Sequence, residues 1–474
     1  MKKLFFTGGC LLLMVGSNAQ DISKKITEAF QQFENDQQLK HAVSSLYVID
    51  AKTGKIVFDK NSQVGLAPAS TQKIITSATA FELLGKDFRY ETWFTSWLSH
   101  QVGVYGIGDP TFGSWRFKST RDTILFKEII AGLKKAGIQS ISEIFTWDNE
   151  ASKKIPSGWI YEDIGNYYGA APYNISWHEN QYDIVFIPGK KVGDEAKIDT
   201  SATDFWGQIT NECKTGPPGS GDNAYIYFIP GERRVLVQGT VPAGVARFTI
   251  SGAHREPACW FSLSFSSYAK SIGFVTNDSA EYECLVRYVS RSDKSKANSS
   301  SKFELDSSGI KRTLYIHYSP SLDSIIYWFL RKSINLYGEA LVNTFAYKKQ
   351  GYNNTEDGLV IVKDFWKQKG IDGSELNIRD GSGLSPLNRV TTHAQVEILK
   401  YAKTKDWFPY FFDALPEYNG MKMKSGTISD AKAFCGYQKS KDGKEYIFSF
   451  IINNYNGPSS GVVNKMYKVL DLLK

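Results

Sequence analysis

The stretch Ala67-Pro68-Ala69-Ser70-Thr71-Gln72-Lys73 runs directly into the apolar segment Ile74-Ile75-Thr76-Ser77-Ala78-Thr79-Ala80-Phe81. The proline indicates a turn at the start of a helix, which we expect to continue as an amphipathic helix. Residues at i and i+3 lie on one helix face, so the Ser70 hydroxyl and the Lys73 amine can meet. A lysine partly shielded from water can take the proton of a serine. The stretch therefore predicts a serine nucleophile with a lysine as its base.

The Ser-x-x-Lys spacing is a weak signal when it is taken alone. It occurs five times, beginning at Ser70, Ser267, Ser299, Ser308 and Ser429. Each match is also compatible with a solvated serine and lysine that happen to have this spacing. The turn and the helix behind it favour Ser70, so partner motifs have to come from the rest of the chain.

Length and composition indicate a folded, globular protein of two or three domains. The chain has 474 residues, of which 42% are hydrophobic and 14% aromatic. These fractions argue against disorder. The formal charge of +7 is modest, and no dense basic block indicates a nucleic-acid partner.

The first 19 residues resemble a secretory signal. Met1-Lys2-Lys3 is basic, Leu4 to Gly16 is mostly apolar, and Ser17-Asn18-Ala19 places small residues where a signal peptidase cuts. We predict that residues 1–19 are removed and that the mature protein lies outside the cytoplasm. No later apolar run is long enough to span a bilayer.

The remaining cysteines are few and carry no metal-binding spacing. Cys213, Cys259, Cys284 and Cys435 are compatible with two disulfides in an oxidising compartment, and the sequence leaves their pairing open. The six histidines are scattered, so we predict no metal site.

Apolar spacing predicts the order of elements. We expect a helix over residues 21–39, two strands over 43–49 and 55–59 joined by a turn, and a helix end at Gly85. Helical patterning returns over 322–347, followed near the end by a strand over 446–453 and a helix over 465–473.

A β-rich region interrupts this pattern. Tyr225 to Ile229, Arg234 to Gln238 and Trp260 to Phe265 are β-like, helical periodicity is scarce, and residues 290–311 are rich in serine and lysine like a linker. We therefore expect a catalytic domain in two parts, residues 20–95 and 312–474. An inserted region of one or two domains, residues 96–311, would separate them.

Two further motifs follow Ser70 in the chain. Ser-x-Asn occurs once, at Ser333-Ile334-Asn335. Its hydroxyl can pass a proton between nucleophile and leaving group, and its amide can donate and accept hydrogen bonds at once. Taken alone it also fits a polar helix end.

The third motif of such sites is a lysine and a hydroxyl on a strand. Lys52-Thr53-Gly54 is a hairpin turn ahead of Ser70, and Lys214-Thr215-Gly216 runs into Pro-Pro-Gly ahead of Ser333, so we reject both. Lys424-Ser425-Gly426 comes last, and the residues after it predict two strands joined by a short connection.

Together the three motifs resemble a known family, the class C low-molecular-mass penicillin-binding proteins, which are D-alanyl-D-alanine carboxypeptidases/endopeptidases. Further matching stretches extend the resemblance over nearly the whole mature chain. They are Gly106 to Thr111, Tyr168 to Pro172, Trp177 to Asn180, Asp380 to Ser385 with Asn388, and Phe448 to Asn454. Two departures are the serine in Lys-Ser-Gly and the isoleucine at 334, and neither removes a motif hydroxyl, lysine or asparagine.

The resemblance implies an α/β (α+β) fold, the penicillin-binding/serine β-lactamase-like transpeptidase fold, interrupted by inserted β-rich domains. It implies that Ser70 attacks the penultimate D-alanine carbonyl, that Lys73 is the base, and that Ser333 and Lys424 return the proton. Substrate would be bound by Asn335, Ser425, Gly426 and Thr427. For the Asp380 to Asn388 segment we expect a structural role, and a substrate contact by Ser382 only as a second reading.

The same resemblance implies peptidoglycan stem peptides as substrates, β-lactams as covalent inhibitors, a periplasmic location and no cofactor. A β-lactamase or an esterase of the same clan is the nearest alternative, and a non-catalytic peptidoglycan-binding scaffold is the alternative from another class. The balance of carboxypeptidase and endopeptidase activity, the role of the inserted domains and the oligomeric state stay open.

Overall fold

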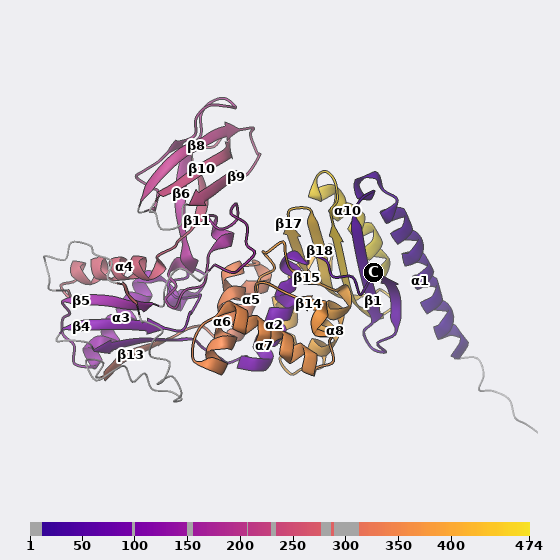
Figure 1. Cartoon of the computed structure of the whole chain (residues 1–474), viewed down its shortest axis with the longest axis horizontal. Coiled ribbons are helices and arrows are strands. Elements are labelled where there is room, and N and C mark those ends of the chain that lie inside the picture. Colours follow the sequence, from indigo (N-terminus) through magenta and orange to yellow (C-terminus); the bar gives the residue numbers. More distant parts are fainter. Residues whose placement is uncertain are drawn as a thin grey trace, which may run out of the picture.

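The computed structural model describes residues 12–96, 100–148, 155–205, 207–228, 234–275, 286–288 and 312–474. Figure 1 shows three lobes, one of which stands above the other two in this view. One lobe carries a large sheet flanked by helices, a second carries β4, β5 and β13 with α3 and α4, and a third carries β6 and β8 to β11.

The large sheet joins both ends of the chain. Its strands lie in the order β16 (Glu417–Tyr418), β17 (Met421–Ile428), β18 (Ala431–Lys439), β19 (Glu445–Asn453), β1 (Val43–Asp50) and β2 (Ile56–Lys60). Every neighbouring pair is antiparallel. The central strands are buried almost throughout because helices cover both faces.

Alternate residues of β1 pack against different helix layers, as the two-residue period of a strand requires. Leu46 and Val48 join the core under α1 (Leu12–Glu34) and α10 (Ser459–Leu470). Tyr47 and Ile49 join the larger core that contains α2 (Lys73–Leu84) and α8 (Thr392–Lys403). The sheet therefore supports helix α2, which follows Ser70, from one side.

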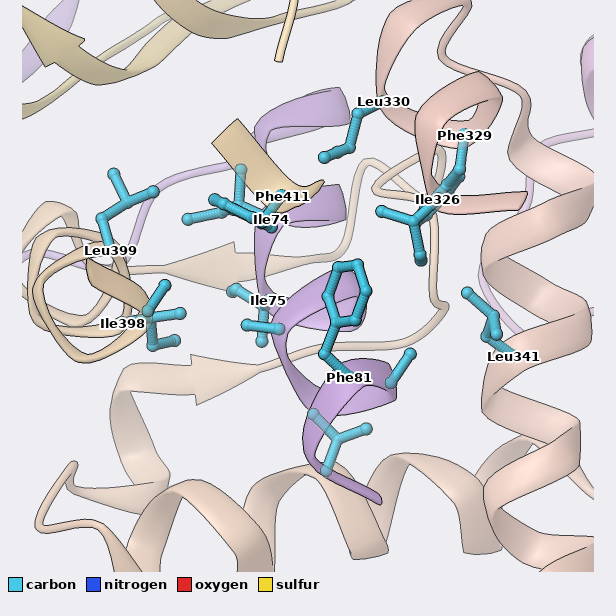
Figure 2. Packing of buried hydrophobic residues seen from close by; sticks show 14 of the residues in the cluster. Ile74, Ile75, Phe81, Ile326, Phe329, Leu330, Leu341, Ile398, Leu399 and Phe411 are labelled. Carbon is cyan, nitrogen blue, oxygen red and sulfur yellow. The ribbon is translucent and has the colours of Figure 1, made fainter. Parts of the chain in front are cut away.

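Helix α2 is enclosed by other helices. Residues Lys73 to Phe81 are all buried, so the predicted helix is confirmed but its predicted amphipathic character is wrong. Figure 2 shows its apolar side chains meeting those of neighbouring elements. The surrounding helices are α5 (Leu322–Arg331), α6 (Asn335–Gln350), α7 (Thr355–Gln368), α8 and α9 (Phe408–Ala414).

Several other local predictions agree with the structure. β1 and β2 form the predicted hairpin, and Gly85 ends α2 with φ of 80°. The first helix begins at Leu12 and ends at Glu34, and residues Gln37–Leu39 form a separate 3-10 turn. Residues 1–11 of the predicted signal lie outside the described residues.

Two predicted helices have different limits in the structure. The pattern over 322–347 is broken into α5 and α6 by the residues around Ser333, which has φ of 57°. The last helix begins at Ser459 rather than 465: Pro458 is its N-cap, and the buried Val462 belongs to its first turns.

The described residues between 91 and 318 contain three sheets, and one of them extends beyond the predicted limits, 96–311, of the inserted region. Their strand orders are β8 (Gln208–Gly216), β10 (Arg234–Pro242), β9 (Asn223–Phe228); β11 (Phe248–Ala253), β6 (Gln181–Ile187), β7 (Lys197–Ile198); and β12 (Val286–Tyr288), β5 (Glu143–Asp148), β4 (Gln101–Gly106), β3 (Glu91–Ser96), β13 (Arg312–Tyr318). A two-stranded sheet, β14 (Leu376–Asn377) and β15 (Arg389–Val390), lies in the C-terminal part.

Two helices in this region were missed in the sequence. These are α3 (Asp122–Lys135) and α4 (Pro257–Ser271), and α4 contains the segment Trp260 to Phe265 that we expected to be β-like. Pro257 starts α4, and its buried side chains follow helical spacing at Phe261, Phe265 and Ala269. Both helices pack on the five-stranded sheet.

The chain leaves the catalytic part and returns to it at one place, because β3 and β13 pair in antiparallel fashion. The rejected Lys214-Thr215-Gly216 does end a strand, β8, contrary to our reading, because the prolines lie just beyond the last ladder residue. It belongs to a sheet of the inserted region. The predicted linker at 290–311 lies outside the described residues.

The cysteines do not form the two disulfides with which the sequence was compatible. Cys213 and Cys435 are free and buried, whereas Cys259 is disulfide-bonded. Two disulfides among the four cysteines are therefore excluded.

We expect Phe81→Ala to destabilise the protein by about 3–5 kcal/mol, because it leaves a cavity in the core around α2. Phe81 is 2% exposed and stacks on Trp407 with ring centroids 5.0 Å apart. Leu83→Ala in the same helix is the control, since Leu83 is 41% exposed. Urea unfolding measures both, and equal losses of stability would contradict the packing described here.

Candidate active site

The nucleophile turn is a short 3-10 helix, Ala69–Gln72, which passes directly into α2. Ala69 precedes Ser70 and has φ of 46°, a left-handed conformation that is costly for a residue with a side chain. Ala69 is fully buried, whereas Ser70 is partly exposed. The turn thus presents the Ser70 hydroxyl at the surface of an otherwise closed core.

The Lys73 amine is held by acceptors from three segments. Its Nζ lies 2.9 Å from Ser70 Oγ, 2.7 Å from Asn335 Oδ1 and 2.7 Å from the Ser382 carbonyl oxygen. A protonated amine can donate to all three. A neutral amine has two hydrogens, which suffice for the amide and the carbonyl, and its lone pair then faces the Ser70 hydroxyl.

Burial sets the charge state of this lysine. Lys73 is 0% exposed, and burial lowers its pKa well below the ordinary value, with the nearby Lys424 charge acting in the same direction. Asp380 and Glu339 oppose this shift in the pKa of Lys73. Desolvation, which the sequence analysis invoked for this lysine, is therefore the larger cause, and the like charge of Lys424 comes second.

The break between α5 and α6 places the second motif. Ser333 has φ of 57° in this break, and Asn335 is the first residue of α6. Asn335 Oδ1 accepts from Lys73, and its Nδ2 donates to the Tyr168 carbonyl at 2.8 Å. Within the described part of the chain the Ser333 hydroxyl has no hydrogen-bond partner. Asn335 is therefore hydrogen-bonded to Lys73, the partner of Ser70, and the Ser333 hydroxyl is free to bond another group.

The third motif lies on β17, beside the nucleophile turn. A Cβ added at Gly426 would lie 2.9 Å from the Ser70 nitrogen and 2.6 Å from the Pro68 oxygen, so only glycine lets the strand approach this closely. Thr427 follows and is exposed, and Ser425 is partly exposed. The strand thus offers two hydroxyls beside the Ser70 backbone.

Lys424 is the second buried amine of the site. It is 1% exposed, and its Nζ donates to the Ser425 carbonyl at 2.8 Å. Burial lowers the pKa of Lys424 to about 7, and the charge of Lys432 adds to the shift. This lysine changes its charge near neutral pH.

Asp380 connects the signature segment to the nucleophile helix. It is fully buried, and its carboxylate accepts hydrogen bonds from five groups. These are Gly383 N at 2.7 Å, Ser385 N at 2.6 Å, Asn388 Nδ2 at 3.0 Å, Gln72 Nε2 at 3.1 Å and Trp159 Nε1 at 2.9 Å. This geometry supports the structural role expected for the segment, and for Ser382 it shows a backbone contact to Lys73.

Sequence reasoning missed three contributors to the site. Glu339 lies one helical turn after Asn335 and is fully buried, and burial, together with the nearby Asp380 charge, raises its pKa. Trp159 and Tyr168 come from the inserted region and reach Asp380 and Asn335. The four-residue spacing from Asn335 could have indicated Glu339, but no local signal marks the other two as neighbours of Ser70.

The described residues contain no cluster of three or more histidine, cysteine, aspartate or glutamate side chains that could hold a metal ion. Their helices are also too short or too polar to cross a bilayer.

A serine hydroxyl beside a buried lysine, with a Lys-Ser-Gly strand at its side, defines a serine hydrolase of the penicillin-binding fold. The chain belongs to the D-Ala-D-Ala carboxypeptidase 3 (S13) family, whose sequence profile matches residues 26–283 and 305–417. The family predicted from the three motifs is confirmed, and with it the assignment as a serine peptidase.

Curated relatives match over most of their length. The D-alanyl-D-alanine carboxypeptidase of Actinomadura sp. (strain R39) is 25% identical, over 90% of this chain and 80% of that protein. The D-alanyl-D-alanine carboxypeptidase DacB of Haemophilus influenzae is 22% identical, over 85% of this chain and 83% of that protein.

Solved structures confirm the predicted fold class. Penicillin binding protein 4 from Haemophilus influenzae superposes with a TM-score of 0.73 at 18% identity, covering 95% of this chain and 99% of that chain. The same protein complexed with a β-lactam gives a TM-score of 0.68 at 17% identity, over 96% and 98% of the two chains. The inserted β-rich lobes are thus part of a known architecture.

We expect Gly383→Ala to lower the rate of Ser70 acylation about a hundredfold, the cost of a displacement near 1 Å. Gly383 has φ of 86°, and an added Cβ would lie 1.9 Å from the Ala69 carbonyl oxygen, so the nucleophile turn has to move. Gly443→Ala is the control, because Gly443 has φ of 84° with nothing within 4 Å of its added Cβ. Labelling by fluorescent penicillin measures the rate, and equal rates in the two variants would contradict the close approach.

Proposed function

We propose that this serine peptidase cleaves the D-alanyl-D-alanine bond of peptidoglycan stem peptides through an acyl-enzyme on Ser70. The observation that carries the proposal is the 2.9 Å contact between Ser70 Oγ and a fully buried Lys73 Nζ. An amine with a lowered pKa, within hydrogen-bond reach of a hydroxyl, meets the requirements of a general base.

Acylation begins when Ser70 Oγ attacks the carbonyl carbon of the penultimate D-alanine and its proton passes to the lone pair of Lys73. The Ser70 and Thr427 backbone N–H groups would hold the oxyanion, a contribution of about 3 kcal/mol per donor. The close approach of Gly426 to the Ser70 nitrogen, which puts β17 beside the turn, supports this pairing.

The leaving D-alanine needs a proton on its nitrogen as the peptide bond breaks. The Ser333 hydroxyl and Lys424 would relay to that nitrogen the proton that Lys73 took from Ser70, so that Lys73 is neutral again when the C–N bond has broken. A Lys424 pKa of about 7 suits a group that gives and regains a proton near neutral pH. A water molecule then attacks the ester carbonyl and gives a proton to Lys73. The bond between Ser70 Oγ and the acyl carbon breaks, the proton passes from Lys73 to Ser70 Oγ, and the shortened peptide leaves as a carboxylate.

Asn335 and β17 would orient the substrate. The Asn335 amide, fixed by Lys73 and the Tyr168 carbonyl, would bind the peptide backbone. The Ser425 and Thr427 hydroxyls and the Lys424 charge would hold the terminal carboxylate, with Gly426 giving the strand room to lie beside the nucleophile. Anionic oxygen is the natural partner of these donors.

Location and substrate range follow from the same assignment. The amino-terminal segment supports export by a signal peptide cleaved after Ala19, and the proposed action on peptidoglycan supports a periplasmic location for the mature protein. The same site would accept terminal and cross-linking D-alanyl bonds. β-Lactams, whose carbonyl and carboxylate match those of the substrate, would acylate Ser70.

Ser70→Ala should abolish both covalent labelling by penicillin and release of D-alanine, because both need the same oxygen nucleophile. Mass spectrometry of the intact protein and of peptidoglycan fragments measures the two effects. Ser429→Ala, at another Ser-x-x-Lys match, is the control and should retain labelling. Labelling that persists in Ser70→Ala would refute the assignment, and rapid turnover of the acyl-enzyme by the wild-type protein would favour a β-lactamase.

The pH dependence of kcat/KM should be bell-shaped. Activity rises with pH as Lys73 loses its proton, at a pKa well below that of an ordinary lysine. It falls as pH increases past the pKa of Lys424, about 7 in the free enzyme, because the charge that holds the carboxylate is lost. Asp380 and Glu339 raise the pKa of Lys73, which sets the rising limb, and Lys432 lowers the pKa of Lys424, which sets the falling limb. A kcat/KM value that climbs steadily to pH 10 would contradict this scheme.

A further inference from the structure

Behind the Lys-Ser-Gly strand lies a third buried amine. Lys432 is on β18 directly opposite Thr427 of β17, across a two-residue turn. Its Nζ donates to Thr427 Oγ1 at 2.7 Å, and it lies 4.9 Å from the centroid of the Phe434 ring. The side chain therefore points along the sheet toward the predicted carboxylate-binding hydroxyl.

The hydrogen bond determines how the Thr427 hydroxyl can act. Its oxygen already accepts from Lys432, so its own hydrogen is free to donate to another group. Thr427 is exposed, whereas Lys432 is only 8% exposed. The lysine thus holds the hydroxyl oxygen from the protein side, which leaves the hydroxyl hydrogen free to donate to a group bound from the solvent side.

Within the described ranges, neither Lys432 nor Lys424 forms an ion pair with an acidic side chain. Burial lowers the pKa of Lys432 to about 8, and the two amines are close enough for Lys432 to lower the pKa of Lys424. A buried, unpaired positive charge is costly, and a bound anion relieves that cost.

We propose that Lys432 is a specificity-determining positioning residue, which orients the Thr427 hydroxyl and adds the positive charge that selects substrates with a free terminal carboxylate. The inference rests on the proposed function, because the anion concerned is the carboxylate of the peptide or β-lactam that acylates Ser70. Lys432 acts through Thr427 and through its charge, and it takes no part in the transfer of protons at Ser70.

The test compares benzylpenicillin, which carries a free carboxylate, with its methyl ester, which does not. The second-order rate constant for acylation of Ser70 is measured with each probe, and their ratio expresses the preference for the carboxylate. Lys432→Met should lower this ratio about tenfold, the effect of losing one hydrogen-bonded charge. Lys432→Arg, which keeps charge and donors, should restore the ratio to within about threefold of the wild-type value.

Two further variants make the result specific. Lys439→Met removes an exposed lysine from the end of the same strand and should leave the ratio unchanged. Lys432→Gln keeps a donor for Thr427 without the charge, and it replaces Lys432→Met if that variant does not fold, as judged by thermal unfolding. A ratio between those of wild type and Lys432→Met in the glutamine variant supports both parts of the proposal.

The failures are distinguishable. If wild type is acylated by neither probe, the proposed function and this inference both fall. If wild type is acylated and the folded Lys432 variants lose the same factor with acid and ester, or lose nothing, then the role of Lys432 is overturned while the proposed function stands. A decrease confined to the acid, which the arginine variant restores, supports the inference.

Discussion

The structure depends on burying one amine without giving it a counter-ion in contact. Lys73 Nζ meets a hydroxyl, an amide oxygen and a carbonyl oxygen, all of them neutral. Neutral acceptors satisfy the hydrogens of the amine but do not hold a positive charge as a carboxylate would. Glu339 and Asp380 raise the pKa of Lys73, but neither carboxylate contacts its amine. The Asp380 carboxylate instead accepts hydrogen bonds from five other donors. Lys73 is consequently kept close to losing its proton.

This arrangement explains why distant segments have to converge. The three acceptors belong to the nucleophile turn, to the start of α6 and to the segment after Asp380. None of these can satisfy the amine alone, and each is itself strained or tightly packed. Ala69 and Ser333 have positive φ, and Gly383 lies where no side chain fits. Strain of this kind persists only when the surrounding packing enforces it, and the two cores on either side of the large sheet supply that packing.

The inserted region is part of this enforcement. Trp159 donates to Asp380 and the Tyr168 carbonyl accepts from Asn335, so two residues far from the catalytic segments in sequence fix two groups of the site. The pairing of β3 with β13 brings the chain back beside the point where it left. The catalytic sheet can therefore be assembled from both ends of the chain around one insertion.

The parts of the molecule that the sequence predicts are those set by local pattern. The β1–β2 hairpin, the helix after Ser70 and the strand pair around Lys424 were predicted because alternation, turn residues and spacing act over a few residues. The family and fold class followed from the order of three motifs. What could not be predicted depends on tertiary contact: the enclosure of α2, the reach of Trp159, and the helix α4, whose serines and aromatic residues looked β-like.

Lys432 shows the limit between these two cases. Its motif, Ser429 to Lys432, was one of five equal matches and was set aside as a chance spacing. A two-residue turn after Ile428 nevertheless places Lys432 opposite Thr427 in the antiparallel pair. Counting residues outward from that turn in the sequence would have predicted this pairing. The strand register shows that Lys432 and Thr427 are neighbours, but it does not show what Lys432 does. Two buried amines, Lys424 and Lys432, lie on the side of β17, and two buried acids, Glu339 and Asp380, act on Lys73. The site therefore has a cationic side and an acidic side. The acidic side would adjust the proposed base, whereas the cationic side has no anionic partner among the described residues, and the carboxylate of the proposed substrate would supply one.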